Sequence, residues 1–390
     1  MVKLRTEDGL EGLGEAFFHA ATVETYLHST VAPLVLALDD PNPESVGRAL
    51  TPYVGFQGGG IENRARGAVD IALWDLLGKR TGQPVAALLG GPVQDRIRIY
   101  NTCAGSGYVG DTSQQNSANW GLERSGKFED LQAFLERPRA LAKDLLAEGI
   151  TAMKIWPFDR GAERHGGNVI SPEDLARGIW VLDEIRSEVG DAMDIMVELH
   201  GMWNVASAVK IVQSIEKFHP YWVEDPVRAD MPQGLRAVRE ATSIPIATGE
   251  TVVGARGFLP LLLADGLDVA TVDVQWTGGL TEARKVATLA DAFGRAFAPH
   301  DCTGPITLAA CAHLVMSQPN GLIQETVRAF VRGWYAEVVT RGPAIHGDLM
   351  TLTADPGLGV ELAESFTRRA DVVHRSTETT SRGHRALRTV

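Results

Sequence analysis

The sequence contains little cysteine. Its 390 residues include three, Cys103, Cys302 and Cys311, and no two of them have C-x-x-C spacing. An odd number of widely separated cysteines provides neither a disulfide framework nor a zinc site. Such scarcity is typical of a reducing compartment, so we expect a cytoplasmic protein.

Long hydrophobic runs are also absent. No uncharged apolar run approaches the roughly 18 residues that a membrane-spanning helix needs, and the longest candidates, such as Phe258–Ala264, are short. The N-terminal segment Met1–Asp8 carries charges where a secretory signal would need an apolar core. These features predict no membrane partner.

An excess of positive charge is the third absence. The formal net charge is −12 and the pI is near 5.4, whereas a phosphate-binding face needs surplus lysine and arginine. We therefore do not expect nucleic acid as a partner. A hydrophobic content of 44% with 22% charged residues is typical of a globular enzyme, and a chain of this length usually forms two domains.

Three glutamates recur at equal spacing. Glu198, Glu224 and Glu250 lie 26 residues apart, and each follows a short apolar or β-branched run. About 26 residues is one strand plus one crossover helix, so the period indicates successive units of a parallel barrel. Three carboxylates at one barrel mouth would repel one another without a cation between them, and Mg²⁺ prefers oxygen ligands of this kind. We therefore predict a magnesium site formed by these residues.

From Ile97 onward, strand-like runs alternate with helical patterns. The expected strands are Ile97–Cys103, Ala152–Ile155, Asp194–Glu198, Tyr221–Glu224, Ile244–Glu250, Val269–Asp273, Arg295–His300 and Leu322–Glu325. The expected helices are Leu131–Ala147, Pro172–Val189, Val205–Lys217, Gly234–Ala241, Arg256–Ala264, Leu280–Phe293 and Ile306–Ser317. Eight strands and seven helices predict an α/β fold, a (β/α)7β modified TIM barrel over residues 96–329.

The two ends of the chain have different patterns. Thr6–Gly12 is expected to form the turn of a hairpin, and the apolar positions of Ile61–Gly78 lie on roughly one helix face. We interpret residues 1–95 as an N-terminal α+β capping domain on the barrel mouth, completed by part of residues 330–364. Residues 365–390 form a polar basic tail whose end is expected to be partly disordered.

Two segments are expected to be long loops at the functional end of the barrel. Gly105–Gly126 follows the first barrel strand, and Asp159–Val169 follows the second. Unstructured insertions at the carboxyl ends of strands are usually lids or specificity loops. A solvated surface excursion is the alternative.

The sixth and seventh strands end in a carboxylate and an imidazole. Asp273 and His300 are 27 residues apart, so adjacent strands place them side by side. A carboxylate on one imidazole nitrogen fixes the tautomer and leaves the other nitrogen as a positioned base. We predict that His300, with Asp273, is a catalytic base; separately, each could be structural.

Three more residues at strand ends are candidates for the site. His200 lies two residues after Glu198, so strand alternation places both at the mouth; a metal ligand or hydrogen-bonding role is the alternative. Lys154 could bind a substrate carboxylate or be a surface lysine. Glu325 could hydrogen-bond a carboxylate oxygen in its protonated form, or form a salt bridge at the strand end.

A set of ordered motifs carries a family resemblance. They are Glu-Leu-His-Gly at 198–201, Trp-Val-Glu-Asp-Pro at 222–226, Ala-Thr-Gly-Glu at 247–250, Asp273 with His300, Gly-Leu-Gly-Glu-Ala at 12–16, Ala-Val-Asp-Ile-Ala-Leu-Trp-Asp-Leu-Leu-Gly-Lys at 68–79, Leu-Leu-Gly-Gly at 88–91 and Pro-Gly-Leu-Gly-Val-Glu-Leu at 356–362. With these motifs the sequence resembles the enolase superfamily, in its mandelate racemase-like subgroup. The resemblance implies that Mg²⁺ on the three glutamates stabilises an enediolate formed by removal of an α-proton.

Three departures from the family pattern matter. Family members usually begin with one more strand before the one that opens this chain, so we expect either a late start of the sequence or a missing first strand. The racemase pattern has a lysine two residues after Lys154, where this chain has Trp156, so a base on that face is not expected. The first metal ligand of the similar acid-sugar dehydratases is usually Asp, whereas here it is Glu198.

One base and a separate imidazole suit β-elimination of water, with His300 taking the α-proton and His200 protonating the leaving hydroxyl. The Glu-x-His-Gly motif is similar to that of galactonate and mannonate dehydratases, so we expect dehydration of an aldonic or aldaric acid to a 2-keto-3-deoxy acid. A cycloisomerase, epimerase or racemase of the same superfamily is the nearest alternative. A glycosidase using Glu224 and Glu250 leaves Asp273, His300 and Glu198 without a role, and a non-catalytic sugar-acid binding protein is a further alternative.

Substrate specificity is expected to reside in the two barrel loops and in the cap segments Phe17–Ala21 and Gly55–Gly60. The resemblance also implies a homo-oligomer.

Overall fold

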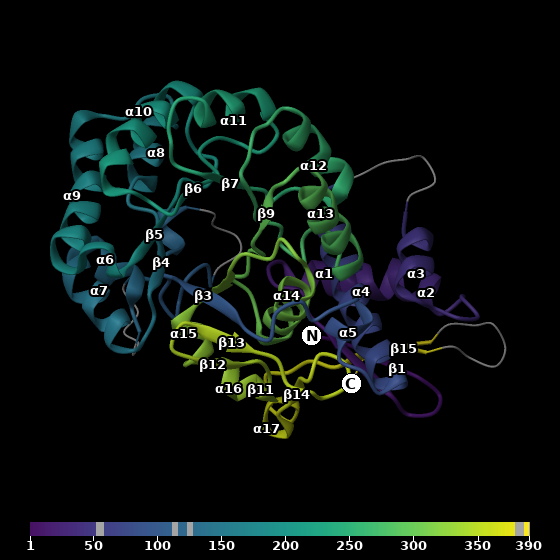
Figure 1. Cartoon of the computed structure of the whole chain (residues 1–390). Helices are drawn as coiled ribbons and strands as arrows, with labels where there is room; N and C mark the ends of the chain where they lie inside the picture. The colour runs from purple at the N-terminus through teal and green to yellow at the C-terminus, as the bar shows by residue number, and fades with distance from the viewer. Residues whose placement is uncertain (52–57, 111–115, 123–127, 379–385, 390) are drawn as a thin grey trace.

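Eight parallel strands form the centre of the computed structural model, which describes residues 1–51, 58–110, 116–122, 128–378 and 386–389 (Figure 1). The strands are β3 (Ile97–Thr102), β4 (Ala152–Ile155), β5 (Asp194–Glu198), β6 (Trp222–Glu224), β7 (Ile246–Thr248), β8 (Val269–Ala270), β9 (Ala296–Phe297) and β10 (Gln324–Thr326). They pair in sequence order from β3 to β9, and β10 pairs with β3. A bridge between Phe297 of β9 and Gly321, just before β10, closes the barrel. The predicted (β/α)7β fold is confirmed.

A layer of side chains fills the inside of the barrel below the strand ends. Each strand contributes one member within or beside it, and the layer consists of Tyr100, Ala152, Met196, Trp222, Ala247, Val269, Ala298 and Ile323. Tyr100 and Trp222 meet edge to face with ring centroids 5.4 Å apart, and the indole N–H of Trp222 donates to Glu224 Oε2 at 3.0 Å. The polar side chains at the barrel mouth therefore pack directly on this layer.

Helices surround the barrel. They are α6 (Asp130–Glu136), α7 (Pro138–Ala147), α8 (Asp159–His165), α9 (Pro172–Val189), α10 (Val205–Ile215), α11 (Pro232–Arg239), α12 (Gly254–Leu263), α13 (Leu280–Ala292) and α14 (Pro305–Ser317). The prediction of a single helix over Leu131–Ala147 is wrong, because the structure has two helices there, α6 and α7. Arg137 leaves the helical conformation before Pro138 (φ −143°, ψ 55°) and separates them.

The loop expected over Asp159–Val169 is also wrong for most of its length. Residues Asp159–His165 form α8, which ends at Gly166 in the left-handed conformation (φ 59°) that glycine favours. Of the other expected loop, Gly105–Gly126, the residues 111–115 and 123–126 lie outside the described residues, and Ser117–Asn119 forms a short 3-10 helix.

The cap is built from the first 90 or so residues around one long helix. Its elements are β1 (Val2–Arg5), β2 (Glu11–Gly14), α1 (Ala20–Tyr26), η1 (Leu27–Val31), α2 (Ala32–Val35), α3 (Pro43–Ala49), α4 (Ile61–Thr81) and α5 (Val85–Leu88). β1 and β2 form the expected antiparallel hairpin. β2 packs so closely on α4 that a Cβ on Gly12 or Gly14 would lie 2.1 or 1.9 Å from a carbonyl oxygen of that helix. Only glycine allows this contact.

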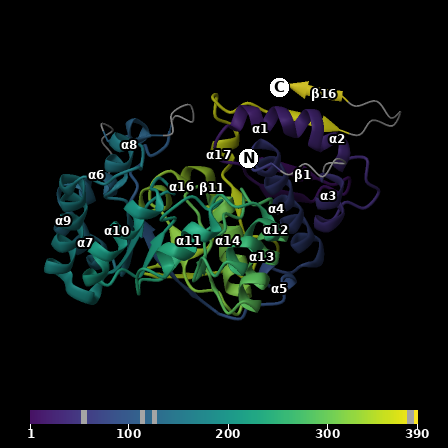
Figure 2. The same cartoon turned by 90° about the horizontal axis from the view of Figure 1, so that it is seen from above.

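Polar side chains join the cap to the barrel. Asp70 of α4 accepts hydrogen bonds from the N–H and hydroxyl of Thr281 (2.9 and 2.5 Å), at the start of α13. Glu15 accepts from the backbone N–H of Thr307 (2.9 Å) in α14, and Phe17 N–H donates to Gln275 Oε1 (2.6 Å). Figure 2 shows α1 of the cap and α8 on the same side of the ring of barrel helices.

The chain after β10 returns toward the cap. Its elements are α15 (Arg328–Val331), α16 (Tyr335–Val338), β11 (Val339–Arg341), β12 (Ala344–His346), β13 (Leu349–Thr351), β14 (Glu361–Leu362), α17 (Glu364–Thr367), β15 (Arg375–Glu378) and β16 (Ala386–Thr389). β15 and β16 pair as an antiparallel hairpin, which differs from the disorder expected for the tail. Thr377 contacts His28 (2.8 Å) and Arg375 pairs with Glu24 (3.4 Å), so β15 lies against the cap.

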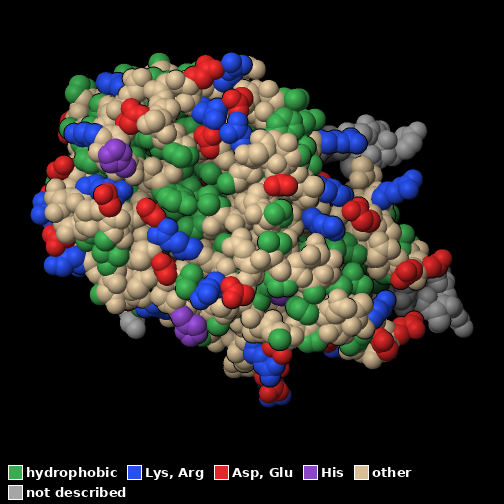
Figure 3. All heavy atoms as spheres, in the orientation of Figure 1, with side chains coloured by type: hydrophobic (Ala, Val, Ile, Leu, Met, Phe, Trp, Pro, Cys, Tyr) green, Lys and Arg blue, Asp and Glu red, His purple; other side chains and the backbone are tan. Residues whose placement is uncertain are grey.

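Two surface properties follow from the described residues. None of the helices in the described part of the chain is both long enough and apolar enough to cross a membrane. On the face in Figure 3, acidic and basic side chains are interspersed.

Candidate active site

The three equally spaced glutamates converge at the barrel mouth. One carboxylate oxygen from each of Glu198, Glu224 and Glu250 lies within 4.8 Å of the others. Glu198 and Glu224 are direct partners in the pairing of β5 with β6. Glu250 is three residues beyond Ala247, the register partner of Glu224, and follows Gly249 (φ 132°). The turn at Gly249 therefore brings Glu250 to the cluster.

The cluster has the composition of a divalent cation site. Glu198 and Glu224 are fully buried, and Glu198 Oε2 and Glu224 Oε1 have no hydrogen-bond partner among the described residues. Burial, reinforced by the charges of Glu198 and Glu325, raises the pKa of Glu224 to about 8 despite the opposing charge of Lys154. Three carboxylates that converge at this distance, with oxygens that accept no hydrogen bond in the described structure, fit an oxygen-coordinated ion such as Mg²⁺.

Lys154 lies among these carboxylates. Its side chain is 4% exposed, and Nζ is 3.0 Å from Glu325, 3.2 Å from Glu224 and 3.4 Å from Glu198. The alternative of a surface lysine is therefore wrong. Burial opposes the charged form, but Glu224 and Glu325 outweigh it and raise the pKa of Lys154 well above its ordinary value. The residue is a permanent cation at the base of the site.

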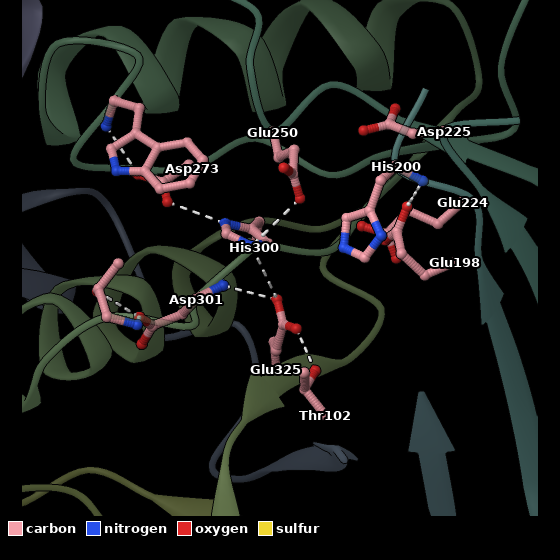
Figure 4. A network of polar contacts seen from close by, with 12 residues as sticks. Thr102, Glu198, His200, Glu224, Asp225, Glu250, Asp273, His300, Asp301 and Glu325 are labelled. Atoms are coloured by element: carbon pink, nitrogen blue, oxygen red, sulfur yellow. Dashed lines mark hydrogen bonds and ion pairs between the residues drawn. The ribbon is translucent and has the colours of Figure 1, made fainter. Parts of the chain in front are cut away.

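Glu325 is fixed by three donors, as Figure 4 shows in part. It pairs with Lys154, accepts a hydrogen bond from the backbone N–H of Asp301 (2.7 Å) and accepts another from the Thr102 hydroxyl. Burial acts to raise its pKa, but Lys154 and His300 lower it to about 2. These three donors favour the ionised carboxylate, which corresponds to the salt-bridge alternative for Glu325.

His300 and Asp273 form the expected pair. They are partners in a parallel bridge that extends the pairing of β8 with β9. His300 Nδ1 lies 2.9 Å from Asp273 Oδ2, and Nε2 faces the cluster, 3.2 Å from Glu250 Oε2 and 3.9 Å from Glu325 Oε2. Burial disfavours the imidazolium, but Glu250, Glu325 and Asp273 raise the pKa of His300 well above its ordinary value.

His200 belongs to a second pair that the sequence did not reveal. Its Nδ1 lies 2.7 Å from Oδ2 of Asp159, a buried residue at the start of α8. Burial opposes protonation, but Asp159 and Glu198 raise the pKa of His200 to about 10. Asp159 therefore favours the imidazolium of His200, the form that can donate a proton.

The backbone places His200 differently from the strand alternation that was expected. β5 ends at Glu198, and His200 is in the left-handed conformation (φ 50°), which is uncommon outside glycine. The turn directs the N–H groups of Leu199 (3.1 Å) and His200 (2.7 Å) at Glu198 Oε1. The imidazole lies beside Glu198 in Figure 4, so the predicted position is reached by a tight turn.

Aromatic side chains form the walls of the mouth. Trp156 is 1% exposed and packs edge to face on His200, with ring centroids 5.8 Å apart. Trp276 lies 5.1 Å from the ring of His300. Above Trp276 is Arg64 of the cap, whose guanidinium carbon is 4.5 Å from the indole centroid.

Sequence reasoning missed several of these residues. Asp225, within the quoted motif at 222–226, accepts hydrogen bonds from Thr248 and the Gly249 N–H. Burial and the charges of Glu198 and Glu250 raise its pKa to about 8. A glycine after the run Asp159–His165 indicates a helix end, which could have revealed α8 and with it Asp159. Arg64 and Trp276 had no comparable signal, because cap docking brings them together.

Family models match most of the chain. Residues 1–90 match the "Mandelate racemase / muconate lactonizing enzyme, N-terminal domain", and residues 137–366 match the "Enolase C-terminal domain-like" model. With its capped (β/α)7β barrel, the chain belongs to the enolase superfamily, within the mandelate racemase and muconate lactonizing enzyme family, which confirms the resemblance and identifies an enzyme family.

Individual relatives agree with this assignment. A D-galactonate dehydratase of Xanthomonas axonopodis pv. citri is 30% identical over 382 residues, covering 95% of this chain and 90% of the relative. The crystal structure of a mandelate racemase subgroup enolase from Agrobacterium tumefaciens has 39% identity and a TM-score of 0.81, covering 94% and 91%. An enolase structure from the Sargasso Sea environmental genome has 37% identity and a TM-score of 0.83, covering 100% and 93%.

Proposed function

We propose that the protein is a Mg²⁺-dependent hydro-lyase that converts an aldonic or aldaric acid into a 2-keto-3-deoxy acid. One observation carries the proposal: two imidazoles, each paired with its own aspartate, meet at the three-carboxylate cluster. The relatedness to enzymes named D-galactonate dehydratase supports the same reaction class.

The ion would be held by Glu198, Glu224 and Glu250, and when bound it supplies positive charge for the substrate carboxylate as the α-proton is removed. Lys154 provides a second positive charge at the same end. These charges matter because an α-proton beside a carboxylate is very weakly acidic.

The two histidines divide the proton transfers. Neutral His300 accepts the α-proton at Nε2 as the Cα–H bond breaks, and Asp273 on Nδ1 stabilises the imidazolium that forms. A cation held by Glu250 would offset the carboxylate charge that otherwise favours protonated His300. The electron pair then expels the 3-hydroxyl as its C–O bond breaks, and His200 donates the proton that makes the leaving group water. The enol product tautomerises to the 2-keto acid.

Isotope exchange in D₂O tests this assignment. His300→Asn should lose both α-proton exchange and keto-acid formation. His200→Gln should still exchange the α-proton but form keto acid about 10²- to 10⁴-fold more slowly, since a positioned acid has been removed. Keto acid is measured as its semicarbazone.

His219→Asn is a suitable control, because His219 is exposed and has a positive φ of 46° that asparagine tolerates. Exchange that is lost in the His200 variant and kept in the His300 variant would reverse the two roles. Turnover without loss of water would instead indicate a cycloisomerase or epimerase.

A further inference from the structure

Arg64 presents a cation to the mouth from the cap side. It belongs to the first turn of α4 and is half-buried. Its guanidinium carbon lies 4.5 Å from the ring centroid of Trp276 and 5.6 Å from that of Phe18. Trp276 is in turn 5.1 Å from the His300 ring, and its backbone N–H donates to Asp273 Oδ1 at 2.7 Å. The indole ring of Trp276 therefore lies between Arg64 and His300, the proposed base.

The guanidinium of Arg64 has no carboxylate within ion-pair distance among the described residues. A guanidinium has five N–H donors, and the hydrogen bond found for Arg64 in the described structure runs from Nη1 to the Phe17 carbonyl at 3.3 Å. Five half-buried or buried arginines pair with carboxylates, namely Arg66, Arg98, Arg239, Arg295 and Arg328. Half-buried Arg186 instead donates to four backbone carbonyls. A partly desolvated cation that lacks such a partner is suited to an anionic ligand.

A second group beside Arg64 also lacks a partner. The indole N–H of Trp276 is buried and has no hydrogen-bond acceptor among the described residues. Buried donors are normally paired, so this N–H is free to take an acceptor from a ligand, as is the indole N–H of Trp156 on the His200 side. A carboxylate has about four acceptor positions and can serve a guanidinium and an indole together.

From these contacts we propose that Arg64 binds a second carboxylate at the far end of the substrate, so that the substrate class is the aldaric acids. The inference rests on the proposed function, in which one substrate carboxylate is held at Lys154 and the three glutamates. Arg64 comes from a different domain and stands on the His300 side. An aldonic acid has a neutral hydroxymethyl group at its far end and leaves this cation unpaired. An aldaric acid supplies a charge at both ends, matching Lys154 at one and Arg64 at the other.

Pairs of acids with the same configuration test the proposal. Galactarate and galactonate, glucarate and gluconate, and mannarate and mannonate are compared by kcat/KM for keto-acid formation and by α-proton exchange in D₂O. The wild type should prefer the aldarate of its configuration by about 100-fold. Arg64→Met should reduce the aldarate-to-aldonate ratio about 10- to 100-fold, the worth of a charge-assisted hydrogen-bonded contact. Arg64→Lys should give an intermediate ratio, since it keeps the charge but loses the paired donors.

Arg66→Met provides the matched control. Arg66 lies one half-turn away on α4 and pairs with Glu282 at 3.2 Å, so its loss should leave the ratio unchanged. Preference for an aldonate or a 6-phosphoaldonate would overturn the proposal. An equal fall in kcat/KM for the aldarate and the aldonate in Arg64→Met would also overturn it. That result would mean that Arg64 acts only through its charge on Asp273 and Glu250. Proton exchange with no preference would refute this inference alone, whereas no exchange with any acid would refute the proposed function as well.

Discussion

His313 should make the contact between cap and barrel sensitive to acid. The residue lies in α14, is 1% exposed, and its Nδ1 accepts a hydrogen bond from the backbone N–H of Ala86 in α5 at 3.0 Å. An imidazolium cannot accept this bond. Burial is the main cause that lowers the pKa of His313 to about 4, from an ordinary value of 6.5.

The sign and size of the effect follow from these two pKa values. Between pH 4 and pH 6.5 the unfolded chain binds a proton at His313 that the folded chain does not, so the free energy of unfolding falls as pH falls. The difference between the two pKa values corresponds to about 3.4 kcal/mol of the free energy of unfolding. On acidification from neutral pH, about 2.5 kcal/mol of this is lost by about pH 4.5.

Denaturant unfolding at about pH 7.5 and about pH 4.5 measures this contribution when the wild type is compared with His313→Gln. The wild type should lose about 2.5 kcal/mol more than the variant between the two conditions. Comparing the two proteins cancels the contributions of groups whose effect on the free energy of unfolding has the opposite pH dependence. Asp70 is such a group, because burial raises its pKa to about 7. His346→Gln, at an exposed position of β12, should behave like the wild type. Equal losses in the wild type and His313→Gln would refute the reasoning.

Two further predictions concern the site. Glu224→Gln should weaken Mg²⁺ binding, measured by calorimetry, by at least about 10- to 100-fold, whereas Glu240→Gln at an exposed position is the control. EDTA should abolish the activity of the wild type. Full activity without metal would contradict the assignment of the three glutamates as ligands. Asp159→Asn should slow keto-acid formation about 10- to 100-fold while α-proton exchange continues, because Asp159 holds the imidazolium of His200. An unchanged rate, as expected for the exposed control Asp183→Asn, would show that Asp159 has no positioning role.

The strand ends could be read from the sequence because parallel pairing converts spacing into position. Glu198 and Glu224 are register partners, and so are Asp273 and His300. The equal spacing of Glu250 was informative for a different reason, since this residue reaches the cluster through the turn at Gly249. Spacing therefore predicted which strand ends meet, but not the backbone conformation at each end.

Residues outside the strands could not be placed in this way. Asp159 depends on α8, which was expected to be a loop, and its contact with His200 joins the ends of β4 and β5. Arg64 and Trp276 are 212 positions apart and meet because α4 docks beside the loop after β8. At this docking surface a Cβ on Gly67 would lie 2.2 Å from the Gln275 carbonyl oxygen. Such contacts depend on how two domains pack, which local sequence patterns do not encode.

The ionisation of the site also depended on its three-dimensional surroundings. For Glu325 the sequence left open a protonated carboxyl or a salt bridge, and Lys154 at 3.0 Å favours the salt bridge. Trp156 stands where a second lysine would provide a base, and it packs on His200 instead of titrating. His200 lies on that side, and in the proposed reaction it donates the proton, since Asp159 favours its protonated form. Within the proposed function, imidazoles at two strand ends, each with its own aspartate, and the lack of a lysine at position 156 favour loss of a hydroxyl over return of the α-proton.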